Sequence, residues 1–207
     1  MRSITFLSGV GVLLAGALSA QELPPLSYNI GGGFTQPVGT LGRYTNQGWD
    51  LQAGSGYNFL PYFGTMLDFN FNSLGINSGT ATNLGIPGGT ETVWSFTLDP
   101  VVHLHPFGRI DPYVIGGGGI YHRADKLTEP ADGFLPVSSP NAMFNSPLVG
   151  DPLEHYYSVN KPGIDIGAGI SFGTKYRAKV YAEARYNRMF VRGADTDFIP
   201  VNFGVRW

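Results

Sequence analysis

The sequence contains no cysteine, so no disulfide can stabilise the fold, and stability must come from backbone pairing and packing. Charged residues are also scarce, at 14% of the 207 residues against roughly 25% in a typical soluble domain. The 13 basic and 15 acidic residues form no basic run, which argues against nucleic acid as a partner. This charge is too little to cover a surface that faces water on all sides.

Apolar runs long enough to cross a membrane as a helix are missing as well. The longest apolar segment, residues 4–18, is shorter than the ~20 residues that a spanning helix needs. It follows Arg2 and precedes a small-residue cleavage site after Ala20, with a cut after Ala17 as the alternative, as in a secretory signal peptide. We therefore expect a signal peptide over residues 1–20 and one exported domain over residues 21–207.

In the mature sequence, apolar residues alternate strictly with polar or small residues instead. Its last ten residues place Ile199, Val201, Phe203, Val205 and Trp207 on one side and Pro200, Asn202, Gly204 and Arg206 on the other. A strand of this kind suits a closed sheet with lipid outside and polar side chains inside. Seven earlier segments share the period of two, so the predicted strands cover residues 28–35, 49–57, 65–71, 94–103, 113–121, 164–172, 179–187 and 198–207. This pattern predicts an all-β fold, an eight-stranded antiparallel up-and-down transmembrane β-barrel.

The distribution of charge indicates which face meets lipid. The apolar side of the predicted strands carries no charged residue, whereas the other side collects Asp50, Asp68, Asp99, Asp165, Lys179, Glu183, Arg185 and Arg206. A lipid-facing Lys or Arg costs ~2–4 kcal/mol at mid-membrane, so the apolar side is expected to face lipid. The alternative, a soluble ligand-binding barrel with the apolar side inward, would expose a face made mostly of glycine. Glycines fit better inside a narrow barrel, as predicted for Gly31, Gly54, Gly116, Gly118 and Gly167.

Aromatic residues near the strand ends support the same arrangement, because transmembrane barrels carry an aromatic girdle at each interface. The periplasmic girdle is predicted to contain Tyr57, Tyr113, Phe172 and Trp207, and the outer girdle Phe34, Trp49, Phe71, Trp94, Tyr121 and Tyr186. With alternate residues assigned to the lipid side in this way, the fifth strand is predicted to turn the following residues toward lipid: Tyr113, Ile115, Gly117, Gly119 and Tyr121. Periplasmic turns are expected to be short, and the longer outer loops to cover residues 37–48, 73–90, 123–160 and 188–197.

A family resemblance follows from two segments. Residues 106–122, PFGRIDPYVIGGGGIYH, combine a turn, a Pro-Tyr strand start and a glycine-rich outgoing strand, and the chain ends on FGVRW. Over residues 26–207 the sequence resembles the outer-membrane β-barrel family that includes the eight-stranded transmembrane domain of outer-membrane protein A. The resemblance implies a barrel surrounded by lipid in the bacterial outer membrane. It also implies that a terminal signal, read by the barrel assembly machinery, is formed by Phe203, Val205 and Trp207.

Charges of both signs are predicted to meet inside the barrel. Buried charges need partners, and the interior of an eight-stranded barrel is just wide enough for side chains to find them. We therefore expect a lumen charge network formed by Asp50, Asp68, Asp99, Asp165, Glu183, Arg185 and Arg206. The main interpretation is a charge-paired plug; the alternative is a narrow solute pore in which Arg185 or Arg206 exchanges acidic partners.

A lipid-modifying enzyme is the third possibility. Some small outer-membrane barrels act on lipid with Ser, His and an acidic residue, and Glu154, His155 and Ser158 lie close together in this sequence. Their spacing matches no barrel lipase pattern. Metal-ligand spacing is also lacking at His103, His105 and His122. We expect a non-enzymatic barrel without cofactor or metal, with a structural or surface-recognition role through outer loops whose ligand the sequence does not name.

Overall fold

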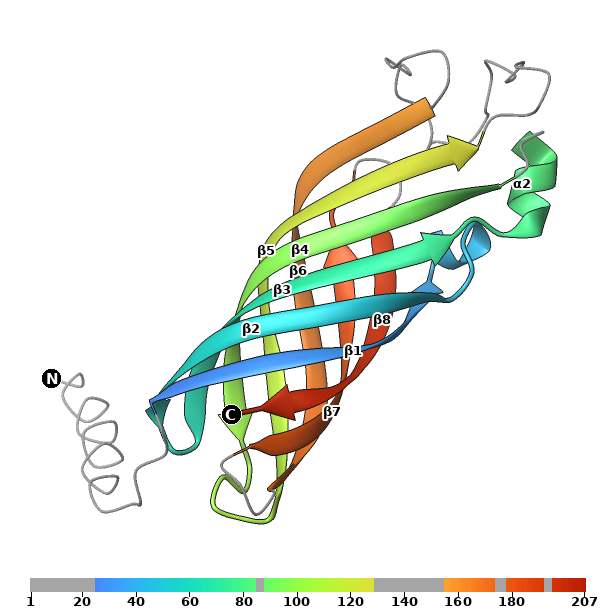
Figure 1. The fold of residues 1–207 in the computed structure, drawn as a ribbon. Coiled ribbons are helices and arrows are strands. Elements are labelled where there is room, and N and C mark those ends of the chain that lie inside the picture. The colour runs from blue at the N-terminus through green and yellow to red at the C-terminus, as the bar shows by residue number, and fades with distance from the viewer. Residues whose placement is uncertain (1–24, 85–87, 129–154, 174–177, 192–194) are drawn as a thin grey trace, which may run out of the picture.

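The computed structural model describes residues 25–84, 88–128, 155–173, 178–191 and 195–207, apart from the side chains of Leu84, His155 and Tyr156. Eight strands follow one another in chain order and close into a barrel in which every neighbouring pair is antiparallel (Figure 1). They are β1 (Leu26–Val38), β2 (Gly48–Leu60), β3 (Phe63–Gly75), β4 (Gly88–His103), β5 (Ile110–Thr128), β6 (His155–Gly173), β7 (Lys179–Met189) and β8 (Thr196–Arg206). The predicted fold class is confirmed, while the predicted signal peptide lies outside the described residues.

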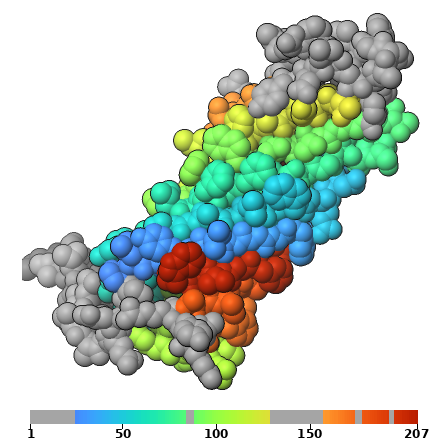
Figure 2. All heavy atoms as spheres, viewed as in Figure 1, coloured from blue at the N-terminus to red at the C-terminus, as the bar shows by residue number. Residues whose placement is uncertain are grey.

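The first and last strands form the seam that closes the barrel. β1 and β8 pair antiparallel with Ile30 opposite Val205. Beyond the last ladder pair, the Tyr28 and Trp207 backbones exchange two hydrogen bonds, with N–O distances of 2.9 and 3.0 Å. In Figure 2 the red β8 lies directly against the blue β1. Closure satisfies the backbone groups that an open sheet would leave facing lipid.

Burial alternates along the strands, with polar side chains inside and apolar side chains outside. On β2, Asp50 is 3% exposed and its neighbour Leu51 is 53% exposed. On β6, Asp165 is 5% exposed and Ile166 is 68% exposed. The barrel therefore has a polar interior and an apolar belt, as predicted for every strand except the fifth.

The predicted phase of the fifth strand was wrong. Tyr113 and Tyr121 are 1% and 0% exposed inside the barrel, whereas Ile120 is 62% exposed on the outside. Since side chains alternate, Gly117 and Gly119 face the lumen, and the predicted lumen residues Gly116 and Gly118 face outward. The same alternation puts three charged residues on the inner face: Asp111, Arg123 and Asp125. Turning these charges inward outweighs any preference of the two tyrosines for a membrane interface.

The two ends of the barrel differ. One end has short connections, such as the turn between Leu60 and Phe63, and the other carries η1 (Leu41–Arg43) and α2 (Ser78–Leu84). The predicted outer loops were too long, because β3, β4, β5 and β6 all extend into them. β5 and β6 each have 19 residues, whereas β7 and β8 have 11, so β5 and β6 rise beyond β7 at this end (Figure 1). In the described ranges no helix is long and apolar enough to cross a membrane.

Candidate functional site

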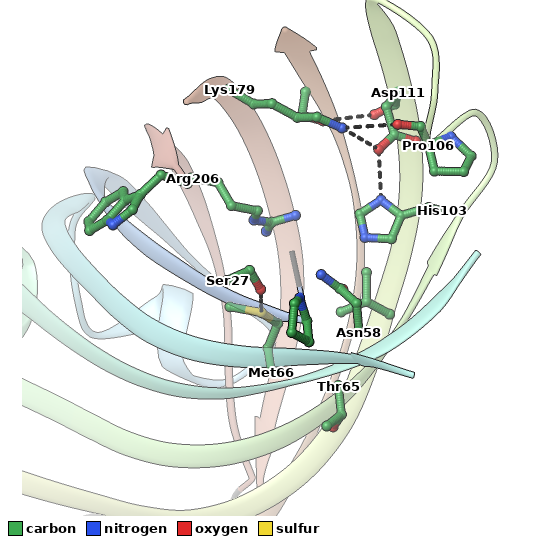
Figure 3. Close-up of a pocket in the computed structure, with 13 residues that line it drawn as sticks. Ser27, Asn58, Thr65, Met66, His103, Pro106, Asp111, Lys179 and Arg206 are labelled. Carbon is green, nitrogen blue, oxygen red and sulfur yellow. Dashed lines mark hydrogen bonds and ion pairs between the residues drawn. The ribbon is translucent and has the colours of Figure 1, made fainter. Parts of the chain in front are cut away.

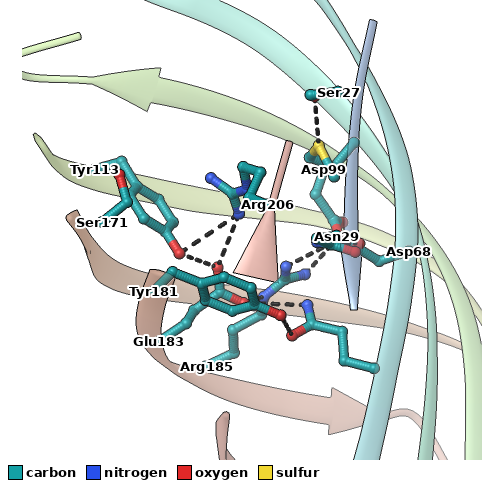
Figure 4. A network of polar contacts seen from close by, with 12 residues as sticks. Ser27, Asn29, Asp68, Asp99, Tyr113, Ser171, Tyr181, Glu183, Arg185 and Arg206 are labelled. Carbon is teal, nitrogen blue, oxygen red and sulfur yellow. Dashed lines mark hydrogen bonds and ion pairs between the residues drawn. The ribbon is translucent and has the colours of Figure 1, made fainter. Parts of the chain in front are cut away.

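The centre of the lumen is occupied by one guanidinium group. Arg185 points inward from the middle of β7, and its three nitrogens face three different carboxylates (Figure 4). Nη2 donates to Asp68 at 2.6 Å, Nη1 to Asp99 at 2.7 Å, and Nε to Glu183 at 2.5 Å. Asp165 lies 3.8 Å from Nη1. Strands β3, β4, β6 and β7 are thus joined across the lumen by one side chain.

A second group of contacts lies on the side of the lumen toward the short turns. Arg206 Nη2 is 3.8 Å from Glu183 Oε2, and its guanidinium lies over the rings of Tyr113 and Tyr181, 4.7 and 5.2 Å from their centroids. The Tyr113 hydroxyl donates to Glu183 Oε2 at 2.8 Å. Gln52 accepts from the Tyr181 hydroxyl and donates to Glu183 Oε1, both at 3.2 Å. Glu183 is therefore shared between the two arginines and held by neutral donors.

The structure places Asp50 apart from the other six predicted network residues. Its carboxylate accepts a hydrogen bond from the Thr35 hydroxyl at 3.1 Å, and in the described part of the chain no lysine or arginine pairs with it. Asp50 lies opposite Asn72 on β3, nearer the end that carries η1. Asp50 was grouped with the others only because it lies on the inward face of its strand. The alternation of side chains gives that face, but not the level of a residue along the barrel axis.

Several lumen partners were not predicted. The tyrosines and Gln52 carry no charge, so they were not predicted as members of the network. The alternation of side chains could have placed two of them in the lumen. Gln52 points to the same face of its strand as Asp50, and Tyr181 points to the same face as Glu183. Tyr113 and Tyr121 were assigned to the wrong face. Tyr121 donates to Asn187 at 2.9 Å.

An apolar cluster fills the lumen on the other side of the charge network. Six buried residues contribute to it: Leu41, Leu74, Val93, Tyr121, Met189 and Phe198. Leu41 comes from η1, so the connection between β1 and β2 supplies a side chain that enters the barrel end. The middle and this end of the lumen are therefore occupied by side chains.

Comparison with known proteins identifies the family. Residues 8–207 match the family model described as outer membrane protein beta-barrel domain. The chain belongs to this family. The match places this barrel in the bacterial outer membrane, as predicted from the sequence.

Solved structures show the same fold at low sequence identity. Neisserial surface protein A is 12% identical with a TM-score of 0.58, over 88% of this chain and 96% of that chain. A major outer membrane protein from Thermus thermophilus is 10% identical with a TM-score of 0.58, over 88% and 97%. Ail, the attachment invasion locus protein of Yersinia pestis, is 17% identical with a TM-score of 0.50, over 87% and 98%. No curated protein sequence matches the chain.

Membrane boundaries can now be assigned to this outer-membrane barrel. Such barrels have short periplasmic turns and longer extracellular connections, so the end with η1 and α2 faces outward. Trp49 and Phe71 belong to the outer girdle, with ring centroids 5.4 Å apart, and Trp94 stacks on His122 at 4.8 Å. Trp207 lies at the periplasmic end, 6.1 Å from Tyr28. A signal function of Phe203, Val205 and Trp207 stays a prediction; Phe203 and Trp207 are exposed on the lipid face.

Three inward-facing charges lie beyond the outer girdle. Arg123 Nη2 is 2.7 Å from Asp125 Oδ2, and its Nε is 3.3 Å from Glu91 Oε1. Burial raises the pKa of Glu91 to about 8, because the loss of hydration outweighs the attraction of Arg123, and Asp125 raises it further. One guanidinium shared by two buried carboxyl groups therefore holds the outer ends of β4 and β5 together.

The structure also describes some of the residues whose spacing in the sequence argued against catalysis and metal binding. His103 Nδ1 is 2.7 Å from Asp111 Oδ2, and His122 Nδ1 is 2.7 Å from Asn160 Oδ1 at the opposite end of the barrel. Among the described residues no group of three or more His, Cys, Asp or Glu could hold a metal ion. Ser158 is exposed on β6, whereas Glu154 and the side chain of His155 lie outside the described residues.

Proposed function

We propose that this protein is a non-enzymatic outer-membrane barrel that recognises a partner at the cell surface through the raised sheet of β4, β5 and β6. One observation carries the proposal: among the described residues, no strand lies beside the upper part of β6 on the side away from β5. β5 pairs with β6 as far as Leu127 opposite His155, whereas β7 pairs with it only as far as Met189 opposite Gly163. An unpaired strand edge is a template for an added strand.

The orientation of the backbone groups on this edge follows from one hydrogen bond. Phe190 N donates to the Pro162 carbonyl at 3.1 Å, so the Pro162 carbonyl faces β7. Backbone groups of alternate residues point to the same edge, so those of Asn160 and Ser158 also face that side. Within the ranges that the structure covers, no strand pairs with β6 there. The edge thus offers donors and acceptors to an extended segment of a partner chain.

A proline on this edge tests the proposal. Ser158→Pro removes a backbone N–H that faces the open side and spares the ladder to β5. We expect peptides selected from a displayed library on the lipid-embedded barrel to bind this variant at least about tenfold more weakly, the loss of roughly 1.4 kcal/mol. Ser158→Ala keeps the N–H and should bind them as the unmodified protein does. Equal binding by Ser158→Pro would argue against edge recognition.

A solute pore is the second candidate, and it makes a different prediction. The Arg185 network and the apolar cluster around Leu41 occupy successive levels of the lumen. Eight strands leave an interior that side chains can fill. We therefore expect the refolded protein to insert into planar bilayers without stepwise conductance. Discrete conductance steps that vanish when the folded protein is omitted would support the pore instead.

A further inference from the structure

The periplasmic mouth of the barrel contains a cavity of about 440 Å³ (Figure 3). This volume lies in the ~300–1,000 Å³ range of small-molecule sites. Part of its wall is apolar and buried, formed by Met66 and Val101. The charged part of the wall comes from Asp111, Lys179 and Arg206, with His103 beside them. The cavity lies at the opposite end of the barrel from the raised sheet.

Arg206 reaches into this cavity with unused hydrogen-bonding capacity. It is 7% exposed, and in the described part of the chain its Nε has no hydrogen-bond partner. Its Nη2 has two long contacts among the described residues, 3.5 Å to the Tyr113 hydroxyl and 3.8 Å to Glu183. Figure 3 shows the guanidinium extending from β8 toward the space between Ser27 and His103. The described contacts of Nη2 are long for hydrogen bonds, so the guanidinium retains the capacity to bind an acceptor in the cavity.

A second cation stands next to Arg206. Lys179 on β7 is its register partner, and both side chains line the cavity. Like charges directly opposite on neighbouring strands destabilise a sheet. Asp111 lies 3.3 Å from Lys179 Nζ, but it also bonds His103 Nδ1 at 2.7 Å and accepts from the His105 N–H at 3.2 Å. The wall therefore carries two positive charges and one negative charge, and Glu183 lies 3.8 Å from Arg206 on the lumen side.

We propose that this cavity binds a small organic anion with a single carboxylate. Its carboxylate lies between the Arg206 guanidinium and Lys179, where it separates the two cations. Its apolar body contacts Met66 and Val101. A single carboxylate suits this wall, because Asp111 and Glu183 already place two negative charges beside the cations, and its planar group matches the guanidinium fork.

Methionine methyl groups provide a local probe and an internal reference. Met66 lines the cavity, whereas Met189 belongs to the apolar cluster near the outer end. With ¹³C-methyl-methionine protein in lipid nanodiscs, 3-phenylpropionate should shift the Met66 methyl resonance saturably and leave that of Met189 in place. The neutral analogue 3-phenylpropionamide should bind at least about tenfold more weakly, because it lacks the charge. No saturable Met66 shift, or equal binding of the amide, overturns the proposal.

Charge variants test which cations hold the carboxylate. Lys179→Gln and Arg206→Gln should each weaken 3-phenylpropionate binding by at least about tenfold. Arg109→Gln is the matched control, because Arg109 is exposed in the turn between β4 and β5 and does not line the cavity. The Met189 resonance checks that each variant is folded. If Arg206→Gln does not fold, the binding measured with Lys179→Gln still tests whether the cavity cations hold the carboxylate. Equal weakening by Arg109→Gln would indicate nonspecific charge attraction and overturn the site.

Discussion

Replacing Arg185 with methionine is expected to lower the free energy of unfolding by about 3–5 kcal/mol. The substitution leaves Asp68, Asp99 and Glu183 buried without the guanidinium that each of them contacts at 2.5–2.7 Å. Uncompensated charges in a low-dielectric interior are far more costly than the loss of one hydrogen bond. Urea unfolding of the lipid-embedded barrel, followed by tryptophan fluorescence and by migration on unboiled gels, measures the effect.

A matched control lies on the same strand. Arg188 is three residues further along β7 on the outer face, and its half-exposed side chain pairs with the buried Asp197 at 2.8 Å. Arg188→Met should lower the unfolding midpoint much less than Arg185→Met, because it leaves one carboxylate without its guanidinium rather than three. Adding Asp68→Asn and Asp99→Asn to Arg185→Met should restore part of the lost stability. If Arg185→Met and Arg188→Met unfold alike, the lumen network does not stabilise the barrel.

The overall architecture could be predicted because lipid and lumen impose opposite demands on adjacent residues. A charged residue is tolerated on only one face of a membrane strand, so Asp50, Asp165 and Arg185 each indicate the phase of a whole strand. Each of the seven strands other than the fifth either contained a charged residue within its predicted bounds or alternated clearly between apolar and polar residues. The alternation of side chains also predicted that Arg185 and Glu183 lie on the same face. It could not show that Arg185 contacts three strands beyond its own, because that depends on the stagger between strands.

The fifth strand shows where this reasoning failed. Its predicted bounds, residues 113–121, contain no charged residue, so two tyrosines set the phase and were taken for girdle residues. The strand actually continues to Thr128, and the added Arg123 and Asp125 share the parity of Tyr113. A longer window would have included them. Most of the raised sheet was assigned to an outer loop for the same reason, since polar residues outside the membrane carry little strand pattern.

The apolar cluster at the outer end could not be predicted from the alternation. Leu74, Val93 and Phe198 occupy inward positions that a polar lumen would assign to polar side chains. Leu41 reaches them from η1, a segment with no strand period at all. Beyond the outer girdle neither face meets lipid, so the rule that separates the two faces ends there. The interior at this level packs like the core of a soluble protein.

Gly119→Ala is expected to prevent the barrel from folding. A Cβ at Gly119 would lie 1.8 Å from the carbonyl oxygen of Phe96, a backbone atom of the neighbouring strand β4. Backbone cannot turn aside as a flexible side chain can, so β4 and β5 would have to separate around the Thr97–Gly119 pair. The cost should exceed the ~1–3 kcal/mol of ordinary overpacking in a core. The fraction of protein that migrates in the folded position on an unboiled gel measures the loss.

Gly75→Ala at the end of β3 is the control, because a Cβ there meets no atom within 4 Å. It should fold to the same extent as the unmodified protein, which separates crowding from the general effect of replacing a strand glycine. The comparison also tests the corrected phase of β5. With Gly119 turned toward lipid, as the sequence first suggested, an added methyl group would meet only lipid chains and Gly119→Ala would fold normally. With Gly119 turned inward, one methyl group is enough to break the ladder between the two strands.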